Sequence, residues 1–477
     1  MKIPGDKIYS KHMQQYDLVV IGGGPAGYTG AIRAAQLGMK VACIEKNKTL
    51  GGTCLNVGCI PSKALLNFSE KYQEAQHHFA DIGIKVDPKL DLAKMMSKKN
   101  QIVQDLCKGI EGLFAKNKIT KFIGEASLVS ANIVEISDGL TKEQISTKNI
   151  LIATGSEVIN LPGINIDEES IISSTGALSL SKVPETMVVI GGGYIGLELG
   201  SVWHRLGSKV IVVEYADRIV PALDTEIGAQ FTKILQKQGI ILKLNSKVLA
   251  AEKKSGKVVL NLQDTVSNKN EQIMADIVLA AVGRKPYTEK LGLDKIGIKL
   301  DDKGRIDINE RFQTSIPNIY GVGDVVKGPM LAHKAEEEAV AAVEIMAGQA
   351  GHVNYNLIPS VIYTWPEVAF AGATEEQLKE NKVSYKIGKF PFLASSRART
   401  MGSTEGMVKI LADSKTDKVL GCHIIGPDAG TLIAEVVAYM EFSASAEDIA
   451  RTCHAHPTLS EAIKEAALAV DKRSVNF

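Results

Sequence analysis

A glycine-rich turn between an apolar strand and a helix occurs twice in this chain of 477 residues, and it constrains the fold more than any other feature. The first copy is YDLVVIGGGPAGYTGAIRAAQLGMKVACIE, in which Leu18 to Ile21 form the apolar strand. The second copy is MVVIGGGYIGLELGSVWHRLGSKVIVVE. A strand, a tight turn and a helix that leads to another strand form a βαβ unit, so we predict an α/β fold with parallel sheets.

Both copies end on an acidic residue at the same distance from the last glycine. Glu45 follows Gly27 by 18 positions (45 − 27), and Glu214 follows Gly196 by 18 positions (214 − 196). In a dinucleotide-binding turn the glycines admit the pyrophosphate, the helix N-terminus offers N–H groups, and the acid accepts hydrogen bonds from the ribose. A turn with packing glycines alone is the weaker alternative, because both copies share the whole context. The predicted binding residues are Gly22, Gly24, Gly27 and Glu45, and then Gly191, Gly193, Gly196 and Glu214.

Two dinucleotide sites imply two cofactors with electron transfer between them, and one of them can be a flavin. At the second site Glu214 favours NAD over NADP, because a carboxylate repels a 2′-phosphate and only Arg218 stands nearby.

The composition excludes several classes of function. Lys and Arg number 55 against 54 Asp and Glu, a net charge of +1, which argues against a nucleic-acid partner. The longest stretch without a charged residue, Ile345 to Pro366, is interrupted by polar residues and Pro359, so no membrane span is expected. The N-terminus has no apolar signal region, and we predict a cytoplasmic protein, with the mitochondrial matrix as the alternative.

Cys54 and Cys59, in GGTCLNVGCIPSKALL, are the one cysteine pair close enough in the sequence to suggest a redox-active disulfide. Six cysteines are too few for a disulfide scaffold, so a disulfide here would be catalytic or redox-sensing. Two structural thiols or half of a metal site are the alternatives. No second Cys/His pair at ligand spacing follows nearby, so no metal is expected.

A redox disulfide needs a base, and HPTLSEA near the C-terminus supplies the strongest candidate. Thr458 or Ser460 can cap a helix whose first turn holds Glu461, and this carboxylate can orient the ring of His456. His454 is the main competitor for the role.

The chain changes character after Gly351, where no glycine turn follows and strands alternate before helices from Thr431 onward. We predict an α+β domain there. TSIPNIYGVGD places Asp324 at a turn that belongs with the first copy, although it follows the second. The predicted domains are residues 1–156 and 285–352 for the first dinucleotide domain, 157–284 for the second, and 353–477 for the C-terminal domain.

Some smaller features predict no chemistry. We expect Glu336 to Glu338 to be a solvated helix face and Lys98–Lys99 a solvated turn. Cys43, Cys107 and Cys422 lie in apolar or helical contexts and are expected to pack inertly.

Taken together, these motifs resemble those of the pyridine nucleotide-disulfide oxidoreductases over essentially the whole chain. The resemblance rests on GGTCLNVGCIPSKALL, IGGGYIGLELGSVWHRLGSKVIVVE, TSIPNIYGVGD, MLAHKAEEE and HAHPTLSEA. It implies two Rossmann-like domains for FAD and NAD and a C-terminal α+β dimerisation domain. It further implies a homodimer that oxidises dihydrolipoamide with NAD⁺, docked on lipoyl-bearing acyltransferase subunits of 2-oxo acid dehydrogenase complexes.

The resemblance also implies roles for individual residues. Cys54 would exchange with substrate, Cys59 would lie against the flavin, Lys63 and Glu198 would pair nearby, and His456 with Glu461 would act on the disulfide of the other subunit. The residues implied to bind FAD are Gly22, Gly24, Gly27, Glu45, Lys63, Thr154, Gly155, Asp324, Met330, Leu331, Ala332 and His333. Those implied for NAD are Gly191, Gly193, Gly196, Glu214 and Gly283, and Gly124, Ser156, Glu198 and Val248 complete the cofactor-binding set.

Three other functions fit the sequence less well. Glutathione-type reductases usually use NADPH, which needs arginines near position 214. Mercuric reductases carry a C-terminal cysteine pair, and this chain ends DKRSVNF. A purely structural role in a multienzyme complex is disfavoured because Cys54, Cys59, His456 and Glu461 are all present.

Overall fold

The computed structural model describes residues 13–477, which form two compact units. Unit 1 holds the described residues up to Cys59, together with Gln101–Glu157 and Arg284–Val353. Unit 2 holds Ile60–Asn100, Val158–Gly283 and Asn354–Phe477. The N-terminal residues 1–12, on which part of the localisation prediction rests, lie outside the described residues.

Unit 1 is built on a seven-stranded sheet whose centre is parallel. β1 (Gln15–Ile21) lies between β2 (Val41–Glu45) and β6 (Lys142–Ile152), and β3 (Thr120–Ile123) extends the sheet beyond β2. β4 (Glu125–Ser130) and β5 (Ile133–Ser137) add an antiparallel hairpin beside β6. β17 (Ile319–Gly321) returns from far along the sequence and pairs with β6 in parallel.

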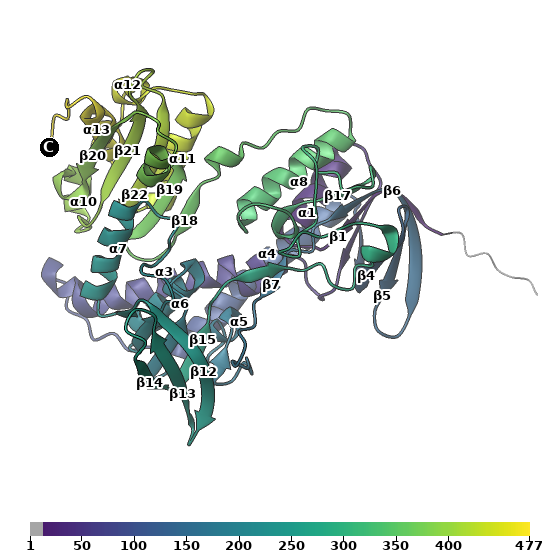
Figure 1. Ribbon diagram of the computed structural model, residues 1–477, viewed down its shortest axis with the longest axis horizontal. Helices are drawn as coiled ribbons and strands as arrows, with labels where there is room; N and C mark the ends of the chain where they lie inside the picture. Colours follow the sequence, from purple (N-terminus) through teal and green to yellow (C-terminus); the bar gives the residue numbers. More distant parts are fainter. Residues whose placement is uncertain (1–12) are drawn as a thin grey trace, which may run out of the picture. The chain divides into compact units, whose positions relative to one another are not determined.

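Two helices of unit 1, α1 (Pro25–Gln36) and α8 (Ala332–Met346), pack side by side (Figure 1). Gly30 allows this close approach, since a Cβ there would lie 3.3 Å from the Ala339 side chain. Arg33 and Glu344 join the two helices by a 2.7 Å ion pair. The unit is completed by α2 (Gly52–Val57), η2 (Asp294–Ile296) and η3 (Gly323–Val325), and β16 (Arg284–Pro286) pairs with β7 (Ser156–Val158).

Unit 2 repeats the parallel design around the second glycine turn. Its five-stranded parallel sheet has the order β11 (Ile241–Lys243), β10 (Lys209–Val213), β9 (Thr186–Ile190), β15 (Ile277–Ala280) and β8 (Ile171–Ile172). An antiparallel sheet of β12 (Ser246–Lys254), β13 (Lys257–Asp264) and β14 (Asn270–Ala275) follows. The helices of this part are α5 (Ser174–Ala177), α6 (Tyr194–Arg205) and α7 (Thr225–Lys237).

The C-terminal part of unit 2 is an antiparallel sheet covered by helices. The strand order is β18 (Ser360–Ile362), β19 (Glu367–Gly372), β22 (Val419–Gly426), β21 (Met407–Asp413) and β20 (Tyr385–Pro391). Helix α11 packs on β19 and β22, and α13 packs on β20 and β21. The helices are η4 (Tyr355–Leu357), α9 (Glu375–Glu380), η5 (Phe392–Ala394), α10 (Ser396–Thr400), α11 (Ala429–Glu441), α12 (Ala446–Arg451) and α13 (Glu461–Val470).

The predicted α/β class is confirmed, but the prediction for Lys98–Lys99 is wrong. Lys98–Lys99 is no solvated turn, because both residues lie inside α4 (Leu92–Lys116). Lys99 is buried, and its amine donates a 2.5 Å hydrogen bond to the Leu178 carbonyl oxygen. The division between the units passes through α4 after Asn100 and through α3 (Cys59–His77) after Cys59, and η1 (Phe79–Ile82) lies between these helices.

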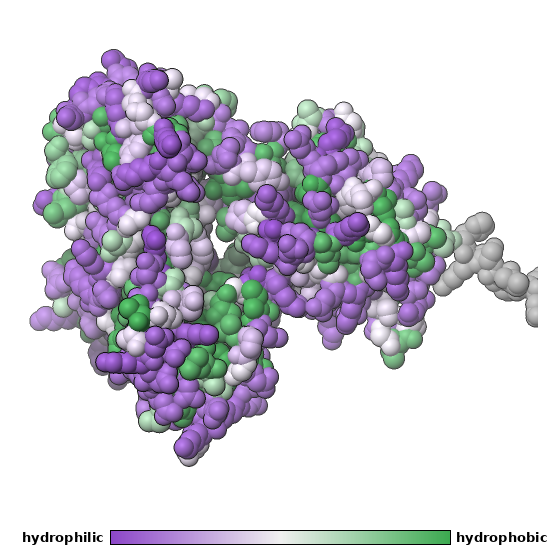
Figure 2. All heavy atoms as spheres, viewed as in Figure 1, coloured by the Kyte–Doolittle hydropathy of each residue, from purple (hydrophilic) through white to green (hydrophobic). Residues whose placement is uncertain are grey.

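Most of the face of each unit seen in Figure 2 is hydrophilic, with apolar side chains scattered between polar ones. Within residues 13–477, no helix combines the length and apolar character that crossing a membrane requires.

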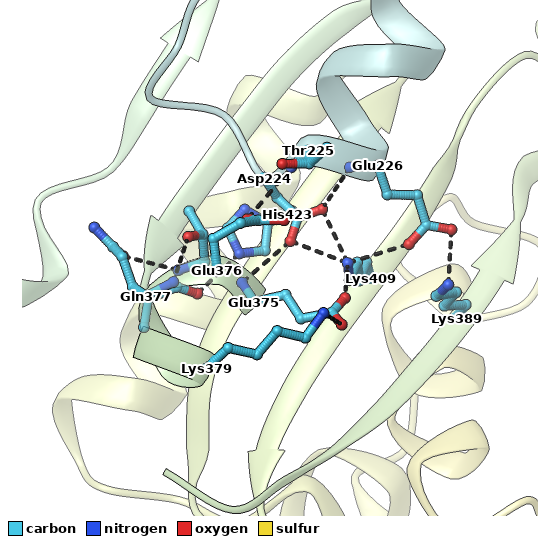
Figure 3. A network of polar contacts seen from close by, with 12 residues as sticks. Asp224, Thr225, Glu226, Glu375, Glu376, Gln377, Lys379, Lys389, Lys409 and His423 are labelled. Atoms are coloured by element: carbon cyan, nitrogen blue, oxygen red, sulfur yellow. Dashed lines mark hydrogen bonds and ion pairs between the residues drawn. The ribbon is translucent and has the colours of Figure 1, made fainter. Parts of the chain in front are cut away.

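A buried lysine joins distant segments of unit 2 (Figure 3). The fully buried Lys409 amine contacts Asp224 at 2.9 Å and Glu375 at 2.7 Å, and Glu226 lies 3.1 Å away. Asp224 also caps α7 through the Glu226 N–H. Burial opposes the charge on Lys409, but its hydrogen bonds outweigh burial and raise the pKa of the amine. The network therefore fixes α7 and α9 to β21.

We expect Lys409→Met to lower the free energy of unfolding by about 3–5 kcal/mol, because it leaves the buried Asp224 carboxylate without its cation. Urea unfolding followed by circular dichroism measures this. Lys389→Met is the matched control, since Lys389 pairs with the half-exposed Glu226 at 2.7 Å and is itself partly exposed. It should cost about 1 kcal/mol or less. Equal losses in the two variants would contradict the assignment.

Candidate functional site

The first glycine turn, Gly22 to Gly27, requires glycine at both ends because a side chain there would collide with the backbone of the protein itself. Gly22 has a φ of +103°, and a Cβ there would lie 2.4 Å from the Ala153 carbonyl oxygen. A Cβ on Gly27 would lie 1.8 Å from the Gly22 carbonyl oxygen. The first position therefore requires a left-handed backbone, and the last brings α1 directly against the end of β1.

The second glycine turn, Gly191 to Gly196, repeats both constraints. Gly191 has a φ of +106°, and its Cβ would lie 2.4 Å from the Ala281 carbonyl oxygen. A Cβ on Gly196 would lie 2.3 Å from the Gly191 carbonyl oxygen. The two glycine turns belong to different sheets, yet they share the positive φ at the first glycine and the close contact at the last.

The middle glycine of each turn has no such internal reason. The nearest described atom to a Cβ on Gly24 is the Gly52 Cα, at 3.7 Å, and none of the described chain comes within 4 Å of a Cβ on Gly193. Neither residue has a positive φ. What these glycines keep clear is the space in front of a helix N-terminus. A pyrophosphate fits that space, because it requires close approach to the backbone.

The helices that follow these turns begin without a side-chain cap. Gly24 precedes α1, Gly193 precedes α6 and Leu331 precedes α8, and none of the three supplies a capping side chain. Some other helices of the chain are capped, as α7 is by Asp224 and α9 by Thr374, whereas α2, α11 and α13 also begin without a side-chain cap. The open N–H groups of α1, α6 and α8 suit bound anions.

The two acids that follow the turns adopt the same geometry. Glu45 accepts hydrogen bonds from the backbone N–H groups of Gly23 and Asn47, each at 2.8 Å. Glu214 accepts them from Gly192 at 2.6 Å and Ala216 at 2.7 Å. Each carboxylate is therefore fixed at the end of its strand, beside the glycine turn, where a ribose would be bound.

A pocket in unit 1 collects several of the predicted residues. Glu45, Gly124 and Thr154 line it together with Lys46 and Tyr287, whose ring lies 3.6 Å from the Lys46 amine. The Thr154 hydroxyl donates a 2.6 Å hydrogen bond to the Tyr287 carbonyl oxygen. The pocket opens beside Glu45, and the Lys46 amine lies over the ring of Tyr287.

Asp324 lies in a polar cluster with Ser156, which was predicted, and Arg284, which was not. The Ser156 hydroxyl donates to Asp324 at 2.5 Å, and Arg284 donates to the Ser156 hydroxyl at 2.7 Å and carbonyl oxygen at 2.6 Å. Burial lowers the pKa of Arg284, and the charges of Asp324, Cys59 and Glu157 oppose this. Arg284 was missed, although its place directly after Gly283 was a usable signal.

The turn that presents Asp324 rests on a buried ion pair of α8. Lys334 and Glu338 are fully buried 3.0 Å apart, and Gly323 donates its N–H to Glu338 and accepts from the Lys334 amine. The predicted solvated face is therefore wrong at Glu338. It is also wrong at Glu336, which is half-buried and accepts a 3.0 Å hydrogen bond from the Tyr28 hydroxyl.

Cys54 and Cys59 stand on two different helices. Cys54 lies in α2, which ends at Val57, and Cys59 is the first residue of α3. Gly58 between them breaks the helical path, with φ −145° and ψ −115°. Both cysteines are half-buried. Cys43, Cys107 and Cys422, which were predicted to be inert, are buried, and burial raises the pKa of each thiol.

Lys63 and Glu198 are brought together in unit 2, as predicted. The Lys63 amine donates a 2.8 Å hydrogen bond to Glu198, whose other oxygen accepts from the Tyr363 N–H at 3.0 Å. The Lys63 amine also lies 4.4 Å from the centre of the Tyr363 ring. Glu198 is buried, and the Lys63 amine and the Tyr363 N–H provide hydrogen bonds to its two carboxylate oxygens.

The structure separates the two candidate histidines. Nδ1 of His456 bonds Glu461 at 2.8 Å, and 69% of the His456 side chain is exposed. Its Nε2 makes no hydrogen bond to any of the described residues. His454 is 4% exposed, with Nδ1 at Thr452 and Nε2 at Glu435. Of these two histidines, only His456 combines an orienting carboxylate with an accessible nitrogen.

Glu461 stays ionised in this arrangement. Burial opposes its charge, but the Thr458 N–H at 2.8 Å and the ring of His456 outweigh burial and lower the pKa of the carboxyl. Thr458 serves through its backbone, and the Ser460 side chain makes no cap. The predicted side-chain cap is therefore absent, although Glu461 begins α13 as expected.

The remaining predicted residues lie within one unit or the other. Gly155 and the segment Met330 to His333 belong to unit 1, where Gly155 accepts a hydrogen bond from the Tyr287 N–H. Val248, at a register shift in β12, and Gly283, with a φ of +124°, belong to unit 2. Among residues 13–477, no group of three or more His, Cys, Asp or Glu side chains is placed to hold a metal ion.

Two family models match this chain. The model described as pyridine nucleotide-disulphide oxidoreductase matches residues 16–339. The model described as the dimerisation domain of the same family matches residues 358–467.

Similar proteins cover nearly the whole chain. The mitochondrial dihydrolipoyl dehydrogenase of Homo sapiens is 56% identical, over 99% of this chain and 94% of the relative, and that of Pisum sativum is 53% identical over the same shares. A leghemoglobin reductase of Glycine max is 54% identical, over 97% and 88%. The structure of the HOCl-induced flavoprotein disulfide reductase RclA from Escherichia coli superposes with a TM-score of 0.85 at 27% identity, covering 96% and 100%.

The glycine geometry predicts different consequences for two neighbouring substitutions. Gly193→Ala should leave thermal stability unchanged within about 0.5 kcal/mol, because its Cβ meets open space, yet lower NAD⁺ affinity by roughly tenfold or more. Gly196→Ala, the matched control, should lower stability by about 1–3 kcal/mol through overpacking against Gly191. Calorimetric NAD⁺ titration and thermal unfolding measure both. A Gly193→Ala protein that binds NAD⁺ normally would contradict the assignment.

Proposed function

The chain belongs to the pyridine nucleotide-disulphide oxidoreductases, and from this premise we propose that it oxidises dihydrolipoyl groups to lipoyl groups while NAD⁺ is reduced to NADH. One observation carries the proposal: an accessible imidazole, His456, is oriented by an ionised carboxylate in a chain with a half-buried Cys54/Cys59 pair. The relatives named dihydrolipoyl dehydrogenase, at 53–56% identity over nearly their full length, support the choice of substrate.

The cofactors are FAD and NAD. FAD would be held by the first glycine turn, Glu45, the pocket at Tyr287 and the turn at Asp324, and NAD by the second glycine turn and Glu214. When bound, FAD would supply the two-electron carrier between the dithiol and NAD⁺. The open helix N-termini bind the phosphates, and the carboxylates orient the riboses.

His456 performs the proton transfer in this proposal. Its Nδ1–H points to Glu461, so Nε2 is the nitrogen that accepts a proton from the substrate thiol. The Glu461 carboxylate stabilises the imidazolium that results, as in a hydrolase triad.

Cys54 and Cys59 then exchange with the substrate. The substrate thiolate attacks Cys54, the bond between Cys54 and Cys59 breaks, and Cys59 leaves as a thiolate. The second substrate thiol attacks the mixed disulfide, which closes the lipoyl ring and releases Cys54. Two electrons and two protons leave the substrate, and the overall products are lipoamide, NADH and a proton.

Glu214 supports NAD rather than NADP. Its carboxylate stands at the end of β10, and the nearest arginine, Arg218, pairs with Asp217. A 2′-phosphate would meet a negative charge there. This speaks against the NADPH-dependent glutathione-type reductases.

We further propose that the enzyme is a homodimer in which His456 and Glu461 act on the disulfide of the other subunit. The match to the dimerisation domain supports a dimer. Its partners would be lipoyl-bearing acyltransferase subunits of 2-oxo acid dehydrogenase complexes. Several relatives are named mitochondrial, which favours the mitochondrial matrix over the cytoplasm predicted from the sequence.

The proposal is tested by the rate of NAD⁺ reduction by dihydrolipoamide on purified, FAD-loaded protein. We expect rapid NADH formation, and we expect Cys59→Ser to abolish it because the electron pair then has no dithiol to leave from. Cys422→Ser, which changes a buried thiol outside the site, is the control. Turnover that survives in Cys59→Ser would refute the mechanism, and an inactive wild type with bound FAD would point to another disulfide substrate.

His456→Gln should lower kcat by roughly 10²–10⁴-fold, the usual contribution of a general base. His454→Gln should change kcat far less, since both nitrogens of His454 are engaged within the fold, and should act on thermal stability instead. Steady-state kinetics with thermal unfolding of both variants measures this. Equal effects on kcat would remove His456 from the role of base.

A further inference from the structure

Asn56 lies inside the redox segment, between Cys54 and Cys59, and all of its side-chain hydrogen-bonding capacity is used. Its amide nitrogen donates to the Leu50 carbonyl oxygen at 3.1 Å and to the Gly52 carbonyl oxygen at 2.9 Å. Its amide oxygen accepts from the Thr49 hydroxyl at 2.9 Å and from the Cys107 thiol at 3.5 Å. Two donors meet two acceptors, and two lone pairs meet two donors.

The orientation of this amide is unambiguous. Both neighbours on the nitrogen side are carbonyl oxygens, which can only accept, so an inverted amide would place oxygen against oxygen. The Asn56 side chain thus joins three parts of unit 1: the loop that precedes α2, the first residue of α2, and α4 through Cys107.

Helix α2 is short, and it begins without a side-chain cap. It contains six residues, Gly52–Val57, its N-cap Gly51 supplies no side-chain cap, and Leu55 is the one residue of α2 that is buried. A helix this short is not stable by itself. At its other end Gly58 breaks the path to α3. The position of Cys54 therefore depends strongly on Asn56.

We propose that Asn56 is a positioning residue that holds Cys54 within reach of Cys59 when the disulfide between them is open; this rests on the redox role proposed for the pair. In the disulfide form the covalent bond itself restrains α2. In the dithiol form that bond is absent, and the Asn56 contacts remain to restrain α2. Removing them loosens the dithiol more than the disulfide, which lowers the effective concentration of one thiol at the other.

The direction of the effect follows from this asymmetry. A looser dithiol is favoured by entropy, so the disulfide becomes easier to reduce. We expect Asn56→Ala to raise the equilibrium constant for reduction of the disulfide by glutathione about tenfold, a shift of about +30 mV in potential. The reaction is balanced: the disulfide and two glutathione thiols give the dithiol and one glutathione disulfide.

The experiment equilibrates the purified FAD-loaded protein with reduced and oxidised glutathione, blocks free thiols with an alkylating reagent, and measures the state of Cys54 and Cys59 by mass spectrometry. Asn117→Ala is the matched control. The Asn117 amide also donates to a carbonyl oxygen four residues earlier, that of Leu113, but at the exposed end of α4. It should leave the equilibrium constant unchanged.

Two milder variants keep the proposal testable if Asn56→Ala does not fold. Thr49→Val and Cys107→Ala each remove one donor to the Asn56 oxygen and should shift the constant two- to fourfold in the same direction. Cys107→Ser retains a donor and should restore the wild-type value. The equilibrium constant for reduction of the disulfide distinguishes a positioning role from a purely structural one. A purely structural role would change thermal unfolding and leave this constant unchanged.

The possible failures are distinct. If the wild type forms the disulfide and Asn56→Ala, or both milder variants, titrate within twofold of it, the inference is wrong while the proposed function stands. If oxidised wild-type protein contains no Cys54–Cys59 disulfide, the proposed function fails, and this inference fails with it.

Discussion

The close contact between a helix N-terminus and a strand end is the constraint on which the rest of this structure depends. At Gly27 and Gly196 a single methyl group would lie 1.8 Å and 2.3 Å from a backbone oxygen of the preceding turn. Because the helix can approach so closely, its free N–H groups point into the space kept clear by Gly24 and Gly193. In each unit a strand-end acid, Glu45 or Glu214, accepts a hydrogen bond from the glycine turn.

Features set by local sequence could be predicted well. The two glycine turns, the acids 18 residues after them and the start of α13 at Glu461 depend on short-range geometry, and each lies where the sequence indicated. What escaped prediction depends on partners distant in the chain. Arg284 reaches Ser156, and Lys99 reaches Leu178, and the partner of each contact lies far away in the sequence.

Charged residues at helical spacing were the main source of error. Glu336 and Glu338 lie in a run of three glutamates, which is typical of a solvated face, yet Glu338 is buried against Lys334 four residues earlier. The sequence contains both partners, but only packing decides whether an i, i+4 pair is exposed or buried. The same limit applied to His454 and His456, which have similar local sequence and differ only in the carboxylate each one meets and in exposure.

The uncapped starts of α1, α6 and α8 imply that bound cofactors also stabilise the fold. A helix that begins with unsatisfied N–H groups is incomplete, and a bound dinucleotide phosphate supplies the missing acceptors. A ligand that binds only the folded chain stabilises it by mass action. The folded fraction of the newly made chain, and with it the resistance of the chain to proteolysis, therefore rises with the concentrations of FAD and NAD.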